Sequence, residues 1–348
     1  MFRRSRIIAV CVLMSSIALQ AQAGLPKGWQ DDTVFVLPDA GRNPWLDAIA
    51  GAEKTIEMSA YKLTDPQIIA ALKAASQRGV SIHLLLEEDT YQHGGSGNAA
   101  SPVAALKDFA TLYTLSKRFT QSHHKMILVD GQWGLVSTGN LDAESFDGIT
   151  DKGIKPARDF AVPILDKARV EEMARVFQAD IKDARLPLKD AHLVWGPDNG
   201  RSTFLALINS AQKSIDVYQQ SVQDEGLALA LAGAARAGVQ VRLLMMAFPF
   251  GPKKDPNIPS QNLLMEAGAQ LNLATHLYIH AKIVIVDGRT MYLGSSNFYA
   301  PTLDGARELG VASENEALIA RVQEVFEKDW AVSQKSGIRK EGENKELK

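Results

Sequence analysis

Apolar and polar residues follow the same order in two separate stretches of the chain. Residues 46–86 align with residues 205–245 without a gap, and both stretches contain Gly-Val-x-x-x-Leu-Leu near their ends. Each has the pattern of a helix, a β-rich run, a second helix and a second β-rich run. We expect strands at Thr55–Tyr61, Val80–Leu86, Ser214–Gln220 and Val239–Met246. Strands that alternate with helices at this spacing predict an α/β fold, with helices packed on the faces of a sheet.

The two stretches also continue in the same way. In each, an Ala-Arg-acid triplet opens a strand-like run, and a helix follows it. The triplets are Ala157-Arg158-Asp159 and Ala306-Arg307-Glu308, and the helices are predicted at Lys167–Ala184 and Glu314–Val332. Ser313 and Glu316 have the spacing of a capping box before the second helix. A period of roughly 150–160 residues indicates a domain duplication rather than a solenoid.

These patterns divide the chain into four parts. We predict a first repeat at residues 24–185 and a second at 186–334, joined within Arg185–Asp198, and a charged, flexible tail at 335–348. Residues 1–23 contain three arginines among the first six residues, continue with a short apolar run and end in Ala21-Gln22-Ala23. This is typical of a cleaved secretory signal, with a retained N-terminal anchor as the alternative. We therefore expect the protein to be exported, either to the periplasm or out of the cell.

Composition limits the chemistry that remains. The one cysteine, Cys11, lies within the predicted signal, so the mature chain would have no disulfide, thiolate nucleophile or cysteine-bound zinc. Without Arg3, Arg4 and Arg6, the 38 basic residues become 35, against 40 acidic residues. This balance is not typical of a protein that coats nucleic acid, although it permits a local basic pocket. We expect neither a cofactor nor a metal.

One set of polar residues recurs at the same spacing in both repeats. The second copy has His280-Ala281-Lys282, then Asp287 and Gly294-Ser295-Ser296-Asn297, and the first has His123-His124-Lys125, then Asp130 and Ser137-Thr138-Gly139-Asn140. In a strand, a histidine and a lysine two positions apart point to the same side and can face one substrate. A turn and a returning strand would bring the asparagine back to the histidine. A single His-x-Lys pair would be unremarkable, but its repetition indicates a shared site.

These residue types suit cleavage of a phosphodiester without a metal. Attack on phosphorus builds negative charge on the non-bridging oxygens, which lysine ammoniums and asparagine amides would stabilise. One histidine can attack while the other protonates the leaving alkoxide, and the roles are exchanged in the second step. Each imidazole then needs a partner on its other nitrogen, and Asp159 and Glu308 are our candidates. We group Asp130 and Asp287 with the catalytic motif, although their place at the far end of the strand indicates a structural role.

The pattern His-x-Lys-x4-Asp-x6-Gly-Ser-x-Asn, present twice, resembles the signature of the phospholipase D superfamily. The second copy matches in full. The resemblance covers nearly all of the mature chain and implies two tandem α/β/α sandwich repeats with mixed β-sheets, related by a pseudo-twofold axis around one shared active site. It also implies a phosphohistidine mechanism in which His123 and His280 are nucleophile and general acid, with His123 favoured as the nucleophile. The phosphate would be bound by Lys125, Lys282, Asn140 and Asn297, assisted by Ser295 and Thr138.

The first copy departs from this pattern at two positions. Ser137 replaces the glycine and Thr138 replaces the serine, which keeps a hydroxyl but adds a side chain where backbone approaches phosphate. We expect activity to survive with altered geometry. Of the other histidines, His124 is expected to point to the opposite face of its strand, and His276 is favoured as structural. The loops Asp89–Pro102 and Ala247–Asn262 would either shape substrate entry or be plain surface loops.

Several functions remain open. Hydrolysis or exchange of a glycerophospholipid headgroup is favoured, because export, acidity and the Phe248/Phe250 loop beside two lysines suit an enzyme with peripheral membrane contact. A nuclease is less favoured, since few aromatic residues and an excess of acids do not fit a nucleic-acid groove. A cardiolipin-synthase-like phosphatidyltransferase would use the same intermediate with another acceptor. A catalytically dead binding protein fits poorly, because both His-Lys pairs are intact. Both motifs lie in one chain, so we expect a monomer.

Overall fold

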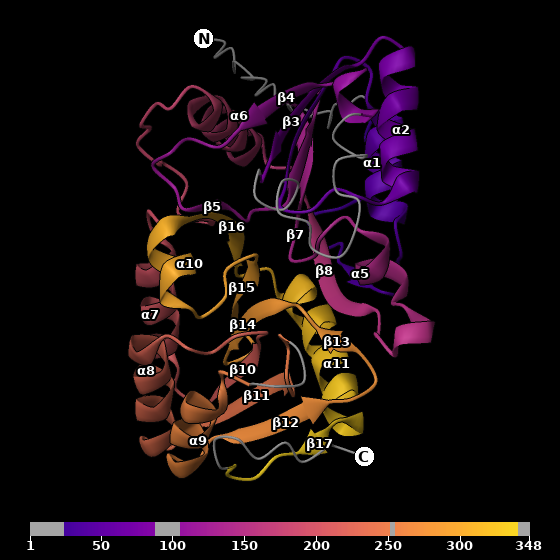
Figure 1. Cartoon of the computed structure of the whole chain (residues 1–348). Coiled ribbons are helices and arrows are strands. Elements are labelled where there is room, and N and C mark those ends of the chain that lie inside the picture. Colours follow the sequence, from indigo (N-terminus) through magenta and orange to yellow (C-terminus); the bar gives the residue numbers. More distant parts are fainter. Residues whose placement is uncertain (1–23, 88–104, 251–254, 340–348) are drawn as a thin grey trace, which may run out of the picture.

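The first repeat is built on one mixed β-sheet in the computed structural model, which describes residues 24–87, 105–250 and 255–339 (Figure 1). The strands lie in the order β1-β8-β7-β6-β2-β3-β4, and β2, β3 and β4 run parallel to one another. They are β1 (Phe35–Leu37), β2 (Thr55–Ala60), β3 (Ser81–Leu86), β4 (Thr111–Thr114), β6 (Met126–Val129), β7 (Trp133–Ser137) and β8 (Ala157–Ile164). The helices are α1 (Asn43–Gly51), α2 (Pro66–Gln77), α5 (Ala143–Asp147) and α6 (Lys167–Ile181), with a 3-10 turn at Thr150–Lys152.

The second repeat has the same plan. Its strands lie in the order β17-β12-β11-β10-β14-β15-β16, and β9 also pairs with β16. They are β9 (Leu193–Gly196), β10 (Ser214–Tyr218), β11 (Gln240–Met246), β12 (Gln270–Ala274), β14 (Lys282–Val286), β15 (Thr290–Gly294), β16 (Ala306–Ser313) and β17 (Gln334–Lys335). The helices are α7 (Gly200–Ser210), α8 (Glu225–Arg236), α9 (Ile258–Glu266), α10 (Ala300–Gly305) and α11 (Glu316–Val332). The predicted duplicated α/β fold with mixed sheets is confirmed.

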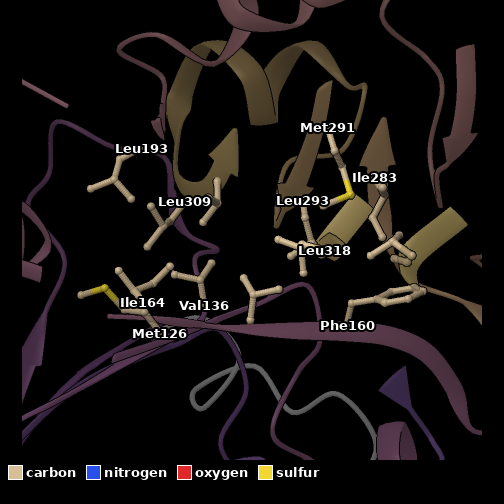
Figure 2. Packing of buried hydrophobic residues seen from close by; sticks show 14 of the residues in the cluster. Met126, Val136, Phe160, Ile164, Leu193, Ile283, Met291, Leu293, Leu309 and Leu318 are labelled. Atoms are coloured by element: carbon tan, nitrogen blue, oxygen red, sulfur yellow. The ribbon is translucent and has the colours of Figure 1, made fainter. Parts of the chain in front are cut away.

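Alternate residues of the central strands face different cores. In β6, Ile127 and Val129 pack with α1 and α2, whereas Met126 and Leu128 face the core between the repeats. That central core contains residues of both repeats, and Figure 2 shows Val136 and Phe160 of the first facing side chains of the second such as Leu293 and Leu309. The two sheets therefore share one continuous apolar core, which holds the repeats in a fixed relation.

Two short strands are exchanged between the sheets. β5 (Gln121–Ser122), from the first repeat, pairs in parallel with the start of β16 in the second. β13 (Tyr278–Ile279), from the second repeat, pairs in parallel with the start of β8 in the first. Figure 1 shows β5 beside β16, where the two halves meet. Because these contacts are reciprocal, the halves are related by the pseudo-twofold arrangement that the sequence resemblance implies.

The helix caps explain why Asp65 and Asp224 occupy matching positions in the repeats. The Asp65 carboxylate accepts hydrogen bonds from the backbone N–H groups of Gln67 and Ile68 at the start of α2. Asp224 accepts one from Leu227 at the start of α8. An aspartate in this place satisfies backbone donors that have no partner within the helix. The predicted capping box before α11 is wrong, because Asn315 is the cap and its side chain accepts from Leu318.

Three predicted segments differ from the structure or lie beyond what it describes. The predicted join holds a strand, β9, because Leu193-Val194-Trp195 is fully buried and completes the sheet beside β16. The first residues of the predicted flexible tail have defined contacts. Lys335 pairs with β12, and Arg339 forms hydrogen bonds with Asn262 and Asp255. The predicted signal and the loop Asp89–Pro102 lie outside the described residues. Within 24–87, 105–250 and 255–339, every helix is too short or too polar to cross a bilayer.

Candidate active site

Both motif histidines lie where the chain passes from one sheet to the other. His123 follows the exchanged strand β5 and precedes β6, and His280 follows β13 and precedes β14. The expectation that histidine and lysine share one continuous strand is therefore wrong, because the chain leaves one sheet and joins the other between them. The backbone N–H of His123 donates to the carbonyl of Arg307 at 2.9 Å, and that of His280 donates to Arg158 at 3.3 Å. Each histidine is thus held by the opposite repeat.

The rings of the two histidines are held by the predicted acids, also from the opposite repeat. Nδ1 of His123 lies 2.7 Å from Oε1 of Glu308. Nδ1 of His280 lies 3.0 Å from each carboxylate oxygen of Asp159. A hydrogen bond at Nδ1 fixes the orientation of an imidazole and leaves Nε2 for chemistry. The geometry therefore presents two oriented imidazoles to whatever lies between them.

A single cavity of about 550 Å³ contains both histidines. Asn140 and Asn297, the predicted phosphate ligands, line it with them. Its wall also includes residues that sequence reasoning did not single out, namely Tyr61, Gln121, Gln220 and Tyr278. Tyr61 and Gln220 end the two aligned β-rich runs, so their position at the carboxyl ends of strands was an available signal.

Lys125 and Lys282 are fully buried and do not line the cavity, but both lie close enough for their charges to act on His123. The ammonium of Lys125 donates to the carbonyl of His123. That of Lys282 has no hydrogen-bond partner among the described residues. Burial lowers the pKa of Lys125 to about 7 and that of Lys282 to about 8. A buried ammonium without a partner is costly unless an anion compensates it, so this charge suits a bound phosphoryl group.

The two acids differ in protonation although they occupy matching places. Burial raises the pKa of Glu308 to about 8, against the opposing charge of Lys125. Burial opposes ionisation of Asp159 too, but its contacts with His280 and the charge of Lys282 outweigh burial and hold the pKa of Asp159 below its usual value. Near neutral pH, Asp159 is ionised and Glu308 is largely protonated.

The histidines are poised differently as a result. Burial, followed by the charges of Lys125 and Lys282, lowers the pKa of His123 well below its usual value. Burial also lowers the pKa of His280, but Asp159 opposes that effect. His123 is therefore neutral in the free protein and suited to attack, and His280 has the ionised partner that stabilises an imidazolium.

The hydroxyls predicted to assist the phosphate lie behind the acids instead. Thr138 donates to Asp159 at 2.5 Å and accepts from the backbone N–H of Phe160 at 3.0 Å. Ser295 donates to the carbonyl of Leu309 at 3.1 Å and accepts from its N–H at 3.0 Å. Both side chains are fully buried, and the cavity wall does not include them. Because the acid and the adjacent strands take up these hydrogen bonds, the structure gives both hydroxyls a supporting place, and their assistance to the phosphate stays a prediction.

The motif aspartates have the structural role, and grouping them with the catalytic residues is wrong. Asp130 accepts from the backbone N–H groups of residues 53–55, at 2.7 to 3.0 Å. Asp287 accepts in the same way from residues 212–214. Both residues have a positive φ, near 55°, in the turn that reverses the chain. They fasten the turn to the preceding strand at the end remote from the histidines.

The remaining predicted features lie around the site. His124 is fully buried with its ring 6.4 Å from that of Trp195, as expected for a core residue. Nε2 of His276 lies 3.8 Å from a carboxylate oxygen of Asp329. His276 does not line the cavity, which agrees with a structural role. Phe250 is 56% exposed and lines the mouth of the cavity. Residues 251–254, which include the two lysines of that loop, lie outside the described residues.

Comparison with known proteins agrees with this geometry. The family model described as "Cardiolipin synthase, PLD-like domain" matches residues 45–181 and again residues 204–330. The cardiolipin synthase of Clostridium perfringens strain 13 is 24% identical over 334 residues, which covers 83% of this chain and 68% of that protein. The human 5'-3' exonuclease PLD3 is 32% identical over 160 residues, covering 40% of this chain and 32% of that protein.

Solved structures show the same fold. The phosphatidylserine synthase of Haemophilus influenzae superimposes with a TM-score of 0.68 at 14% identity, covering 88% of each chain. The repeated match to the family model and the paired histidine motifs support phosphodiesterase or phosphatidyltransferase activity in general. The chain therefore belongs to the phospholipase D superfamily, in its family of cardiolipin-synthase, PLD-like domains.

Proposed function

We propose that the protein is an exported phospholipase D-type phosphodiesterase that hydrolyses or exchanges glycerophospholipid headgroups. The observation that carries the proposal is the pair of imidazoles that share one cavity, each held at Nδ1 by an acid and near two buried lysines. Export rests on the pattern of residues 1–23. One chain supplies both motifs, so we propose that a monomer forms the whole active site.

The proposed mechanism has two displacements at phosphorus. His280 acts in its imidazolium form, which the ionised Asp159 and the negative charge of the bound phosphate favour. Nε2 of His123 attacks, the N–P bond forms, and the P–O bond to the leaving alcohol breaks as this imidazolium gives that oxygen its Nε2 proton. His280 then removes a proton from water or an acceptor alcohol, whose oxygen attacks phosphorus and releases His123. Lys125 and Lys282 stabilise the charge on the non-bridging oxygens, and Asn140 and Asn297 orient the phosphate. The acceptor that reaches the intermediate decides between hydrolysis and transfer.

Two features favour a lipid over a nucleic acid. Phe250 and Tyr299, 56% and 42% exposed, both line the cavity and project aromatic surface at its mouth. Aromatic residues of this kind are favoured at membrane–water interfaces. The similarity to cardiolipin synthases spans most of the chain, whereas that to the exonuclease PLD3 spans less than half. The latter similarity keeps a nuclease as the second candidate.

The test compares both substrates in one reaction. Residues 24–348 are incubated in excess EDTA with mixed-phospholipid liposomes, glycerol, and single- and double-stranded DNA, with His280→Ala as the control. We expect phosphatidic acid or glycerol-exchanged lipid and intact DNA, read by mass spectrometry and a gel. The ratio of the two lipid products separates hydrolase from transferase. Cut DNA with unchanged lipid would establish the nuclease instead, and activity lost to EDTA would contradict the metal-free mechanism.

A further inference from the structure

Each Ala-Arg-acid triplet contacts one histidine of the opposite repeat through both backbone and side chain. The carbonyl of Arg307 accepts from the N–H groups of His123 and His124, at 2.9 and 3.1 Å. The next residue, Glu308, holds the ring of the same histidine. The first triplet repeats this on the other side, since the carbonyl of Arg158 accepts from His280 and Ala281. The position of each arginine backbone therefore fixes the position of one histidine.

The guanidinium of Arg307 is anchored to the repeat that carries His123. It is 4% exposed and forms a two-point contact with Asp180 of α6, at 2.7 and 2.8 Å. Within its own repeat it also donates to Asp198 at 2.7 Å and to the carbonyl of Gly196 at 3.2 Å. The rings of Phe119 and Trp195 lie 4.2 and 5.3 Å from its central carbon. Such a planar, two-point contact restrains direction as well as distance, which a lysine cannot reproduce.

The guanidinium of Arg158 is anchored in the matching way. It is 7% exposed, contacts both carboxylate oxygens of Asp329 on α11 at 2.7 and 3.0 Å, and donates to the carbonyl of Leu37 at 2.6 Å. The hydroxyl of Tyr218 donates to the same carboxylate at 2.7 Å. Asp329 and His280 both belong to the second repeat, so this arginine also joins one histidine to a helix of its own repeat.

We propose that Arg158 and Arg307 are positioning residues, each of which holds the histidine of the opposite repeat in its reactive place. Neither belongs to the wall of the catalytic cavity, so each acts through its histidine. The inference rests on the proposed phosphodiester chemistry. A misplacement of about 1 Å can lower a rate about 100-fold. We therefore expect Arg307→Lys to lower kcat roughly 10- to 100-fold with KM changed less than about twofold.

The decisive property is selectivity between the two histidines. Arg307→Lys and Asp180→Asn should shift the imidazole 15N resonances and titration midpoint of His123 and leave those of His280 unchanged. Arg158→Lys and Asp329→Asn should do the reverse. The resonances are assigned with His123→Ala and His280→Ala. Arg242→Lys is the matched control, because Arg242 also makes a two-point contact with an aspartate, Asp216, within one repeat and lacks a backbone bond to either histidine.

The outcomes separate a positioning role from general stabilisation. If Arg307→Lys fails to fold, Asp180→Asn decides, because it keeps the side-chain shape and leaves the histidines untouched. Equal shifts of both histidines, no shift of either, or a kcat equal to that of Arg242→Lys would overturn the proposal. Absence of turnover by the unaltered protein on every phosphodiester would refute the proposed function and leave the resonance comparison readable.

Discussion

The two repeats satisfy the same backbone group beside the motif asparagine with different side chains. In the first repeat, the hydroxyl of Ser137 accepts from the N–H of Gly139 at 3.0 Å. In the second, the hydroxyl of Tyr292 accepts from the matching N–H of Ser296 at 3.2 Å. Position 294 is glycine because a Cβ there would lie 2.4 Å from that tyrosine oxygen. The departure from the motif at Ser137 is therefore a second packing solution and not a loss of the site.

The acids behind the histidines differ more. Asp159 has the hydroxyl of Thr138 on one oxygen and is ionised, whereas at Glu308 the charge of Lys125, a contact with Ser295 and the charge of Lys282 offset burial only in part. Burial therefore dominates at Glu308 and raises its pKa to about 8. Small differences in environment therefore separate the pKa values of Asp159 and Glu308, which supports the proposed division of roles between His280 and His123.

Removal of either histidine should have the largest effect, and the two variants should fail differently. We expect His123→Ala and His280→Ala each to lower turnover by about 10⁴-fold or more while leaving the fold intact. With a p-nitrophenyl phosphodiester, whose leaving group needs little protonation, His280→Ala should release one burst and stall as the phosphoenzyme. His123→Ala should show no burst.

Intact-protein mass spectrometry and stopped-flow absorbance read this difference, with circular dichroism as the control for folding. A covalent phosphoryl group on His123→Ala, and none on His280→Ala, would exchange the roles of the two histidines. Substantial steady turnover by well-folded His280→Ala would contradict a shared site.

Substitution of the two acids should have the next largest effect, and the loss of kcat should differ between them. Asp159→Asn removes the charge that stabilises the His280 imidazolium, so we expect kcat to fall roughly 100-fold. Glu308→Gln replaces a group that is already largely protonated near pH 7, so we expect a loss of less than about tenfold. Steady-state kinetics at pH 7 measure both. Equal losses would mean that the two acids act alike and that the asymmetry in protonation has no catalytic consequence.

The sequence allowed the fold and most of the site to be predicted, because the duplicated pattern aligns both frames and both motifs. It also pointed to Asp159 and Glu308 as the acids near the histidines. Which acid meets which histidine depends on β5 and β13, two-residue strands too short to leave a pattern. The direction of the Thr138 hydroxyl depends on Asp159 and Phe160 of strand β8. These residues lie more than 20 positions away in the sequence and meet Thr138 only when the sheet forms.

Rising pH should affect activity and stability in opposite directions. Lys125 loses its proton above about pH 7 and Lys282 above about pH 8, so kcat/KM should begin to fall near pH 7 and fall more steeply above pH 8. The unfolded chain, where a lysine has its usual pKa near 10.5, then binds more protons than the folded one. The free energy of unfolding should therefore rise between about pH 8 and 9.5.

Urea denaturation at the two pH values, compared with Lys282→Met, isolates this lysine. The Lys282→Met variant should be inactive, and its free energy of unfolding should rise less between the two pH values than that of the unaltered protein. An unaltered gain in Lys282→Met would assign the effect to other groups, and a kcat/KM that stays constant to about pH 9.5 would show that the free enzyme keeps this ammonium charged.

The two packing solutions beside the asparagines should give the smallest effects. Ser137→Gly and Tyr292→Phe each remove the side-chain acceptor of one backbone N–H, so each should lower the free energy of unfolding by about 1–3 kcal/mol. Neither hydroxyl belongs to the cavity wall, so kcat should change less than about threefold. Chemical denaturation and steady-state kinetics measure these quantities. If Ser137→Gly instead raised kcat with no loss of stability, the glycine of the motif would serve the phosphate directly, and the first repeat would be the weaker half of the site.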